Sequence, residues 1–489
     1  MRRSPRCHSL PLCILLGACG QAGTGDTGEV HATAGATDTS GDPPTTTAST
    51  DPTGSTGSTG STMAGSTTDN SADAAVTYYR DIKSILDTRC TQCHTPGNIA
   101  PFSLLTYDEA RPFADALADS ADAGTMPPWP PDNSCRAYPH DRSLPDADRK
   151  LLRKWAELGA PAGDPDDAPP PTEAPGGAIA YDVELELAPY SPKIIPDEYR
   201  CFLIDWPKDE ESFVTALDVI PGDRQLVHHV IAYALEPKDV DAYRALEASD
   251  PDPGYLCYGG PGGAGNSVWE IPWLGAWVPG TTGGAMPAGT GLRVQPGSVI
   301  AVQMHYHGSA GAKPDQSRLR LRTAPKVDRR AVIMPFTNLD WVLGTEKMHI
   351  PAGDPDAVQS FELDMTSVVG FIFPNGPLTP DAPFVVHAAG LHQHTLGTTS
   401  KLEVVRDGGG GDECLLDIPR WDFDWQGTYE LAEPVTVNPG DRIRVECHWD
   451  NSAANQPIVD GVQQEPHDVG WGEGTGDEMC LGLMYVTAP

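Results

Sequence analysis

The sequence predicts a multidomain protein in which a small all-α domain is followed by two antiparallel β-sandwich (jelly-roll-like) domains. A chain of 489 residues is too long for a single core. Apolar residues recur at helical spacing in the part before residue 160, whereas short alternating runs dominate beyond residue 178. Pro-Gly turns recur in that second part, and each is followed by an alternating strand. We therefore expect the helical domain at 76–163 and the β domains at 178–327 and 328–489.

The N-terminal residues predict export. Residues 1–19 have a basic start, an apolar run too short to span a bilayer as a helix, and a Leu-Gly-Ala-Cys ending at Cys19. This ending resembles the bacterial lipobox, which implies that Cys19 is lipidated and becomes the mature N-terminus. The alternative is an ordinary secretory peptide that is cut nearby. We expect a protein anchored by lipid in the cell envelope, on the periplasmic side or at the outer membrane or cell surface.

Residues 20–75 predict a disordered linker. They are rich in Thr, Ser, Gly and Asp and hold almost no large apolar side chains, so they cannot bury enough surface to fold. The formal net charge of the chain is -35, which argues against general electrostatic binding to nucleic acid or to anionic lipid surfaces. The lipid is therefore the only expected contact with a membrane.

The cysteines indicate an oxidising compartment. The sequence holds 11 of them in an exported chain. Five lie in the signal segment, the lipobox or the motif described next, and six remain. Six cysteines allow fifteen pairings, so their number alone assigns no disulfide. The six are Cys135, Cys201, Cys257, Cys414, Cys447 and Cys480.

The helical domain carries the c-type haem attachment pattern Cys90-Thr91-Gln92-Cys93-His94. In this pattern both thiols add across the haem vinyl groups and the imidazole ligates the iron. Apolar residues at helical spacing precede the motif, so it should follow a helix C-terminus. A simple disulfide or a chance match is the alternative, but export and the paired helices favour haem. The stretch resembles the mono-haem cytochrome c domains that are fused to bacterial oxidoreductases.

A second helix is expected over 145–158, with Ser143 and Asp146 resembling a capping box. Between the two helices, Met126 lies on a loop stiffened by prolines. Its thioether is a candidate sixth ligand of the haem iron, because Met/His ligation is common in cytochromes c. The alternative is that Met126 is a packing residue.

Histidines with metal-ligand spacing lie in the β region. His392 and His394 are two residues apart, so on a strand their rings project from one face toward one ion. His228 and His229 are adjacent, so both can ligate one ion only if the strand twists or bulges there. Otherwise one of them is a core histidine.

The remaining candidate ligands are His305 and Met479. His305 shares the less apolar face of its strand with His307. Met479 lies in Gly-Asp-Glu-Met-Cys, and a thioether favours Cu(I) while imidazole suits copper, zinc, iron and nickel. Five imidazoles and one thioether thus form two sets of three ligands, which predicts a two-copper redox enzyme.

Residues from about 198 to 489 resemble the copper type II, ascorbate-dependent monooxygenases, the family of dopamine β-monooxygenase and peptidylglycine α-hydroxylating monooxygenase. The resemblance is specific because the matching pieces occur in the family's order. They are Tyr199-Arg200-Cys201, Val227-His228-His229-Val230, Trp277-Val278-Pro279-Gly280, Gln303-Met304-His305-Tyr306, His392-Gln393-His394-Thr395-Leu396-Gly397 and Asp477-Glu478-Met479-Cys480.

The resemblance implies two copper ions with different roles. His228, His229 and His305 would hold the electron-transferring copper, with His307 as the alternate to His305. His392, His394 and Met479 would hold the copper that binds O2 and substrate. It also implies the disulfides Cys201–Cys257 and Cys447–Cys480, and it leaves Cys135 and Cys414 unassigned.

The implied reaction is hydroxylation of a C–H bond with O2 and two electrons. Ascorbate, another reductant, an electron-donor protein or the fused haem would supply the electrons. Peptide-amidating members hold a substrate carboxylate with an arginine and polar residues, where this chain has Gly390, Leu481 and Leu483. A small or apolar substrate is therefore expected instead of a glycine-extended peptide. The alternatives are a non-enzymatic copper and haem electron-transfer lipoprotein, or a structural surface module with chance histidines.

Overall fold

The computed structural model describes residues 75–96, 100–170, 179–195, 197–257, 259–262, 271–278, 283–307, 313–459, 462–472, 474 and 476–489. Contacts divide the chain into Met1–Asn70 and Ser71–Pro489, and all described residues belong to the second unit. The predicted signal segment 1–19 with Cys19 lies outside the described residues, and so does the predicted linker except for its last residue. No helix among the described residues is long and apolar enough to cross a bilayer.

The helical region confirms the two helices predicted around the Cys-His motif. A π-helical turn, η1 (Tyr78–Ile82), runs into α1 (Lys83–Arg89), which ends at Cys90. The second predicted helix is α4 (Asp146–Glu157), and it packs its apolar face against η1 and α3 (Ala114–Asp122) around the fully buried Trp155. The remaining elements of this region are α2 (Tyr107–Ala110), η2 (Arg111–Phe113) and η3 (Pro165–Asp167).

The prediction of a capping box at the second helix is wrong. The N-cap of α4 is Pro145, whose side chain accepts no hydrogen bond. The backbone N–H of Ser143 instead donates to the Asp141 carboxylate at 2.7 Å, so Ser143 belongs to the preceding turn.

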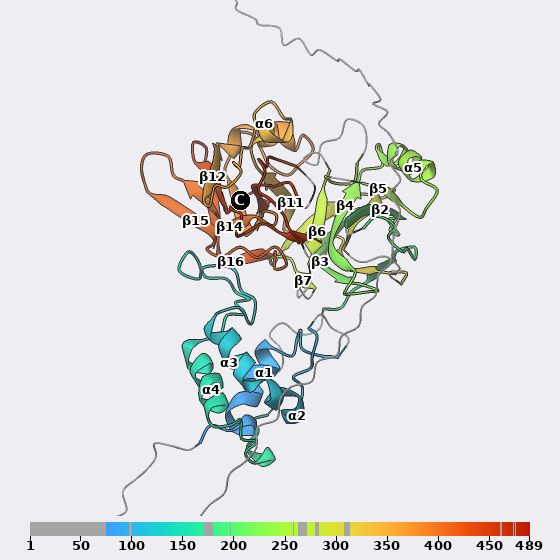
Figure 1. The fold of residues 1–489 in the computed structure, drawn as a ribbon. Helices are drawn as coiled ribbons and strands as arrows, with labels where there is room; N and C mark the ends of the chain where they lie inside the picture. The colour runs from blue at the N-terminus through green and yellow to red at the C-terminus, as the bar shows by residue number, and fades with distance from the viewer. Residues whose placement is uncertain are drawn as a thin grey trace, which may run out of the picture. The chain divides into compact units, whose positions relative to one another are not determined.

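The remainder of the described chain is built mainly of β-sheets (Figure 1). The largest sheet has nine strands in the order β1-β10-β3-β8-β11-β20-β13-β16, with β7 paired to β3. Its strands are β1 (Val183–Glu186), β3 (Ser212–Ile220), β7 (Gly284–Ala285), β8 (Thr290–Val294), β10 (Arg318–Ala324), β11 (Arg329–Phe336), β13 (Phe384–His392), β16 (Thr428–Val437) and β20 (Leu481–Thr487).

Two further sheets cover this one. The five-stranded sheet has the order β5-β2-β9-β4-β6, and the four-stranded sheet has the order β12-β17-β14-β15. Their strands are β2 (Asp197–Asp205), β4 (Val227–Leu235), β5 (Tyr255–Leu256), β6 (Trp273–Trp277), β9 (Val299–His307), β12 (Ala357–Leu363), β14 (Gly397–Val405), β15 (Asp412–Ile418) and β17 (Arg442–Trp449). The pair β18 (Ile458–Val459) and β19 (Val462–Gln463), and the helices α5 (Val240–Ser249), α6 (Leu339–Val342), η4 (Met365–Ser367) and α7 (Val369–Ile372), complete the described elements.

Two buried cores define two sandwiches. In one, Val214 and Leu321 of the large sheet pack against Val302 of the five-stranded sheet. In the other, here the second sandwich, Met484 of the large sheet packs against Val445 of the four-stranded sheet. Among the described residues, the strand pairs are antiparallel except β8 with β11, whose parallel pairing joins the two predicted β domains in one sheet. The predicted boundary at 327/328 falls in the short connection between β10 and β11.

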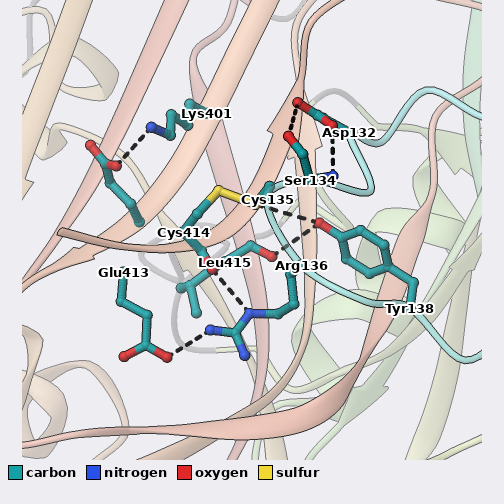
Figure 2. Close-up of a disulfide and its surroundings, with 10 residues drawn as sticks. Asp132, Ser134, Cys135, Arg136, Tyr138, Lys401, Glu413, Cys414 and Leu415 are labelled. Carbon is teal, nitrogen blue, oxygen red and sulfur yellow. Dashed lines mark hydrogen bonds and ion pairs between the residues drawn. A yellow bond between two sulfur atoms is a disulfide. The ribbon is translucent and has the colours of Figure 1, made fainter.

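Three disulfides cross-link the described chain. Cys201–Cys257 and Cys447–Cys480 form as the family resemblance implies. The third, Cys135–Cys414, joins residues 279 positions apart and settles the pair that the sequence left open (Figure 2). Disulfides persist in oxidising compartments, so they indicate an extracytoplasmic protein.

Candidate metal centre

The first histidine set lies on two paired strands of the five-stranded sheet. His228 and His229 are on β4, and His305 on β9 is the direct register partner of His229. The register shifts between Val227 and His229, which is the irregularity that two adjacent histidines need to reach one ion. One ring nitrogen or equivalent ligand atom from each of the three residues lies within 4.8 Å of the others.

The same ring nitrogen of each histidine points into the cluster. The Nδ1 atom of His229 lies 3.2 Å from Nδ1 of His228 and 3.3 Å from Nδ1 of His305. Burial lowers the pKa of His305 to about 4 and holds the pKa of His229 well below its ordinary value. The imidazoles of His229 and His305 are therefore neutral near pH 7 and offer lone pairs, as a metal requires.

Asp197 orients His305 from outside the cluster. Its carboxylate Oδ1 lies 2.8 Å from Nε2 of His305 and 2.8 Å from Nδ1 of His307. A proton held on Nε2 leaves Nδ1 of His305 free to bind a metal. Burial acts to raise the pKa of Asp197, but the hydrogen bonds from both histidines hold it well below its usual range. His307 is thus an exposed neighbour of the carboxylate, and the cluster itself contains His305.

We expect Asp197→Asn to weaken copper binding at the first set by about 10–100-fold, since partners of metal-bound histidines typically contribute that much. Competition with a chelator in the otherwise unchanged protein measures the affinity. His307→Ala is the matched control, because His307 touches the same carboxylate outside the cluster. Equal losses in both variants would show that Asp197 does not act through His305.

The second predicted set surrounds the end of β13. His392 is the last residue of this strand and pairs with Leu481 at the start of β20. Continued by two residues, this antiparallel register places His394 opposite Met479, which is buried. The rings of His392 and His394 have centroids 5.0 Å apart. The disulfide from Cys480 to Cys447 of β17 ties the chain next to Met479 to the core.

Here Nδ1 of each histidine is occupied. Nδ1 of His392 contacts the side-chain oxygen of Gln426, and Nδ1 of His394 lies 2.9 Å from the backbone oxygen of Asp477. This arrangement leaves Nε2 of each ring to bind a metal. Burial lowers the pKa of His392 to about 3 and that of His394 to about 4, so both rings are neutral near pH 7.

A buried carboxylate organises the backbone beside Met479. Glu478 accepts hydrogen bonds from the backbone N–H groups of His394 (2.8 Å) and Leu396 (2.7 Å) and from the indole N–H of Trp449 (2.8 Å). Burial raises the pKa of Glu478 to about 7 in spite of these donors. Glu478 thereby holds the His394 and Met479 segments together.

The two sets face each other. The charges of His392 and His394 contribute to the low pKa of His229, and the charge of His228 contributes to that of His392. Sequence reasoning missed the residues that support the sets, among them Asp197, Gln426 and Glu478. Of these, only Glu478 lay inside a motif that the sequence singled out, beside Met479.

The Cys-His motif of the helical region forms a compact turn. The backbone N–H groups of Cys93 and His94 donate to the carbonyl of Cys90, at 3.1 and 2.9 Å. Nδ1 of His94 lies 3.2 Å from the backbone oxygen of Phe102, which leaves Nε2 available. Cys90 and Cys93 are free of disulfides, and burial raises the pKa of both thiols. This donor set fits covalent haem, whereas Met126 is 38% exposed and its role as a ligand stays a prediction.

Comparison with known proteins supports copper chemistry. Residues 377–487 match the copper type II ascorbate-dependent monooxygenase, C-terminal domain. The chain is 25% identical over 305 residues to the DBH-like monooxygenase protein 1 of Gallus gallus, covering 60% of this chain and 45% of the relative. It is 23% identical over 320 residues to the DBH-like monooxygenase protein 2 of Mus musculus, covering 64% and 46%. With the histidine cluster, these matches show that the chain is similar to the copper type II, ascorbate-dependent monooxygenases, most directly over residues 377–487.

The likeness has a limited extent. A further relative, the MOXD1 homolog 1 of Drosophila melanogaster, is 22% identical over 276 residues, covering 54% of this chain and 35% of the relative. The chain thus spans less than half the length of the curated relatives it matches. Copper is the metal that the family and the cluster of His228, His229 and His305 together support.

Proposed function

We propose that the chain hydroxylates a C–H bond of a small or apolar substrate. The reaction balances as R–H + O2 + 2 electrons + 2 H⁺ giving R–OH + H2O. The observation that carries this proposal is the pair of facing histidine sets. In one set the Nδ1 atoms converge, and in the other the Nδ1 atoms are occupied and the Nε2 atoms are left to bind a metal. Two sets of different geometry suit two different tasks.

His228, His229 and His305 would hold a copper ion that passes on electrons. His392, His394 and Met479 would hold a second copper ion where O2 and substrate meet. Bound copper supplies one-electron redox chemistry and activation of O2, and a thioether favours its reduced state. The protein supplies the geometry, because Asp197, Gln426 and the Asp477 carbonyl fix the orientation of three of the five rings.

The residues beside His392 support the proposed apolar substrate. Gly390 and Leu483 are register partners, and Leu481 pairs with His392 itself. A Cβ atom at position 390 would lie 3.1 Å from the backbone oxygen of Gly427 and 3.4 Å from Thr428 Oγ1. This position is therefore tight for a side chain as large as arginine. Without a cation there, an apolar group fits this edge better than a carboxylate.

We further infer that the helical region is a haem-binding electron donor. Cys90 and Cys93 would bind haem covalently, His94 would ligate its iron, and Met126 would be the sixth ligand. Haem supplies one electron at a time, beside ascorbate or in its place. Lipidation of Cys19 would hold the enzyme in the cell envelope as an exported lipoprotein.

Substrate-dependent O2 uptake tests the proposed reaction. Purified full-length protein loaded with copper is mixed with reductant, O2 and a panel of small apolar substrates, with a glycine-extended peptide as the comparison. We expect O2 uptake that depends on an apolar substrate, and one atom of ¹⁸O from labelled O2 in the alcohol. Copper and haem that cycle between oxidation states while no substrate stimulates O2 uptake would identify an electron-transfer lipoprotein instead.

A further inference from the structure

One loop of the second sandwich touches both histidine sets. Residues 420–426, here the 420–426 loop, connect β15 to β16. The ring of Phe423 stacks on His228 with centroids 5.0 Å apart and planes inclined by 25°. The same ring meets His394 edge-on, with centroids 6.1 Å apart. Phe423 therefore contacts one histidine of each set.

Polar atoms of the loop fix the same rings. The amide oxygen of Gln426 contacts Nδ1 of His392, while its nitrogen donates to the Phe423 carbonyl at 2.8 Å. A carboxylate oxygen of Asp424 lies 3.7 Å from Nε2 of His228, the nitrogen that faces away from the cluster. The indole N–H of Trp421 donates to the His394 carbonyl at 3.0 Å. Through these contacts, a single loop reaches three of the five imidazoles.

The loop begins at a contact with the helical region. The Arg420 guanidinium donates to the carbonyl of Ala123 at 3.0 Å and to the carbonyl of Gly124. These two residues directly follow α3 and precede the turn that carries Met126. The start of the loop is thus hydrogen-bonded to the helical region, which carries the Cys-His motif.

Residues 129–138, here the docking arm, contact the strands on both sides of the loop, and Figure 2 shows the contacts with β15. On β15, Cys135 is disulfide-bonded to Cys414, and Arg136 forms a 2.6 Å ion pair with Glu413. On β16, the Arg136 guanidinium donates to the Glu433 carbonyl at 3.1 Å. The buried Tyr138 is part of the core of the second sandwich. The docking arm therefore fastens the two strands from which the loop emerges.

We propose that the 420–426 loop is a shared positioning element for both histidine sets and that attachment of the helical region, through Arg420 and the docking arm, holds this element in place. The proposal rests on the proposed function, in that the positioned rings are copper ligands. Gln426 and Phe423 act through the histidines, so they are positioning residues. Detaching the helical region should loosen the loop and, with it, His392 and His228.

Copper binding by full-length protein stripped of metal tests this positioning role. Cu(II) is titrated in competition with a chelator, and the electron paramagnetic resonance spectrum of each bound ion is recorded. We expect Gln426→Leu to weaken binding at the second set by about 10–100-fold and to change its Cu(II) spectrum. Arg420→Ala should weaken binding at both sets, with partial rescue in Arg420→Lys. The matched control is Arg442→Ala, which removes an exposed arginine of β17 that pairs with Glu362 of β12.

Hydrogen exchange in the metal-free protein supplies a readout that needs no cofactor. We expect faster exchange of the backbone amides of residues 420–426 in Arg420→Ala and in the double variant Cys135→Ser, Cys414→Ser, but not in Arg442→Ala. Thermal unfolding of each variant verifies that it is folded. Unchanged exchange and unchanged copper spectra in folded variants would overturn the positioning role. Wild-type protein that binds no copper would instead overturn the proposed function, so the two failures are distinguishable.

Discussion

Replacing His394 by alanine should remove one copper ion per chain and lower hydroxylation by about a thousandfold or more. A metal ion contributes several kcal/mol to stabilisation of a transition state, and about 1.4 kcal/mol corresponds to a factor of ten in rate. His394 is buried, and its Nδ1 is held by the Asp477 carbonyl, so Nε2 is the ring nitrogen left for the proposed ligation. Copper content and substrate-dependent O2 uptake measured on the same preparation test this expectation.

His448→Ala is the matched control for this experiment. His448 also lies in the second sandwich, but it pairs with Asp356 and Glu446 on the outer face of β17. We expect this variant to keep both copper ions and its activity. If His394→Ala retained the copper content and the rate of the control, the second set would not be a copper site.

Replacing Cys447 and Cys480 together by alanine should lower the free energy of unfolding by about 3–4 kcal/mol. The disulfide closes a loop of 33 residues, and the chain-entropy estimate for a loop of this length is of that size. Both cysteines are fully buried, so the alanine side chains that replace them stay in the core and gain no stabilising contact with solvent. Denaturant unfolding under oxidising conditions measures the change.

The same double variant should bind copper more weakly at the second set. Cys480 directly follows Met479, and the Glu478 side chain before it holds the His394 backbone. The first set, on β4 and β9 of the other sandwich, should keep its affinity. A loss of stability below about 1 kcal/mol, or equal loss of copper at both sets, would contradict this account of the cross-link.

Local patterns in the sequence predicted local structure well. The helix before the Cys-His motif ends at Cys90, and the second helix covers Asp146–Glu157 within the predicted 145–158. On β17, the alternation of apolar and polar residues in the sequence matches the structure, where Val445 and Trp449 are buried and His448 lies on the opposite face, because side chains of a strand point to opposite faces in turn. These features depend on residues that are close together along the chain. A single sequence is therefore enough to predict them.

Long-range features were beyond the reach of the sequence. The bond between Cys135 and Cys414 spans 279 positions, and nothing in the local pattern favours it over the other pairings. The parallel pairing of β8 with β11, which makes one sheet of two expected domains, likewise depends on tertiary packing. The bulge that turns His228 and His229 together could only be stated as a requirement, and the register shift at Val227/His229 supplies it.

The supporting residues of the site were missed for a related reason. Asp197 and Gln426 reach their histidines across 108 and 34 positions of the chain. Neither belongs to a motif with ligand spacing, so only the folded chain reveals them. Aromatic and acidic residues alternate from Trp421 to Trp425, and this pattern can be seen in the sequence. The pattern alone does not indicate a role at the site, because only the folded strands β15 and β16 bring the segment beside the histidines.

The count of metal ions per chain tests the central claim most directly. Mature full-length protein, expressed with export and haem maturation and then supplied with copper, is analysed for copper and iron together. The two histidine sets predict two copper ions per chain, and the Cys90-Cys93-His94 motif predicts one iron. Protein that is folded, with its three disulfides formed, yet holds iron and no copper would contradict the copper oxygenase and leave a tethered cytochrome on a β scaffold.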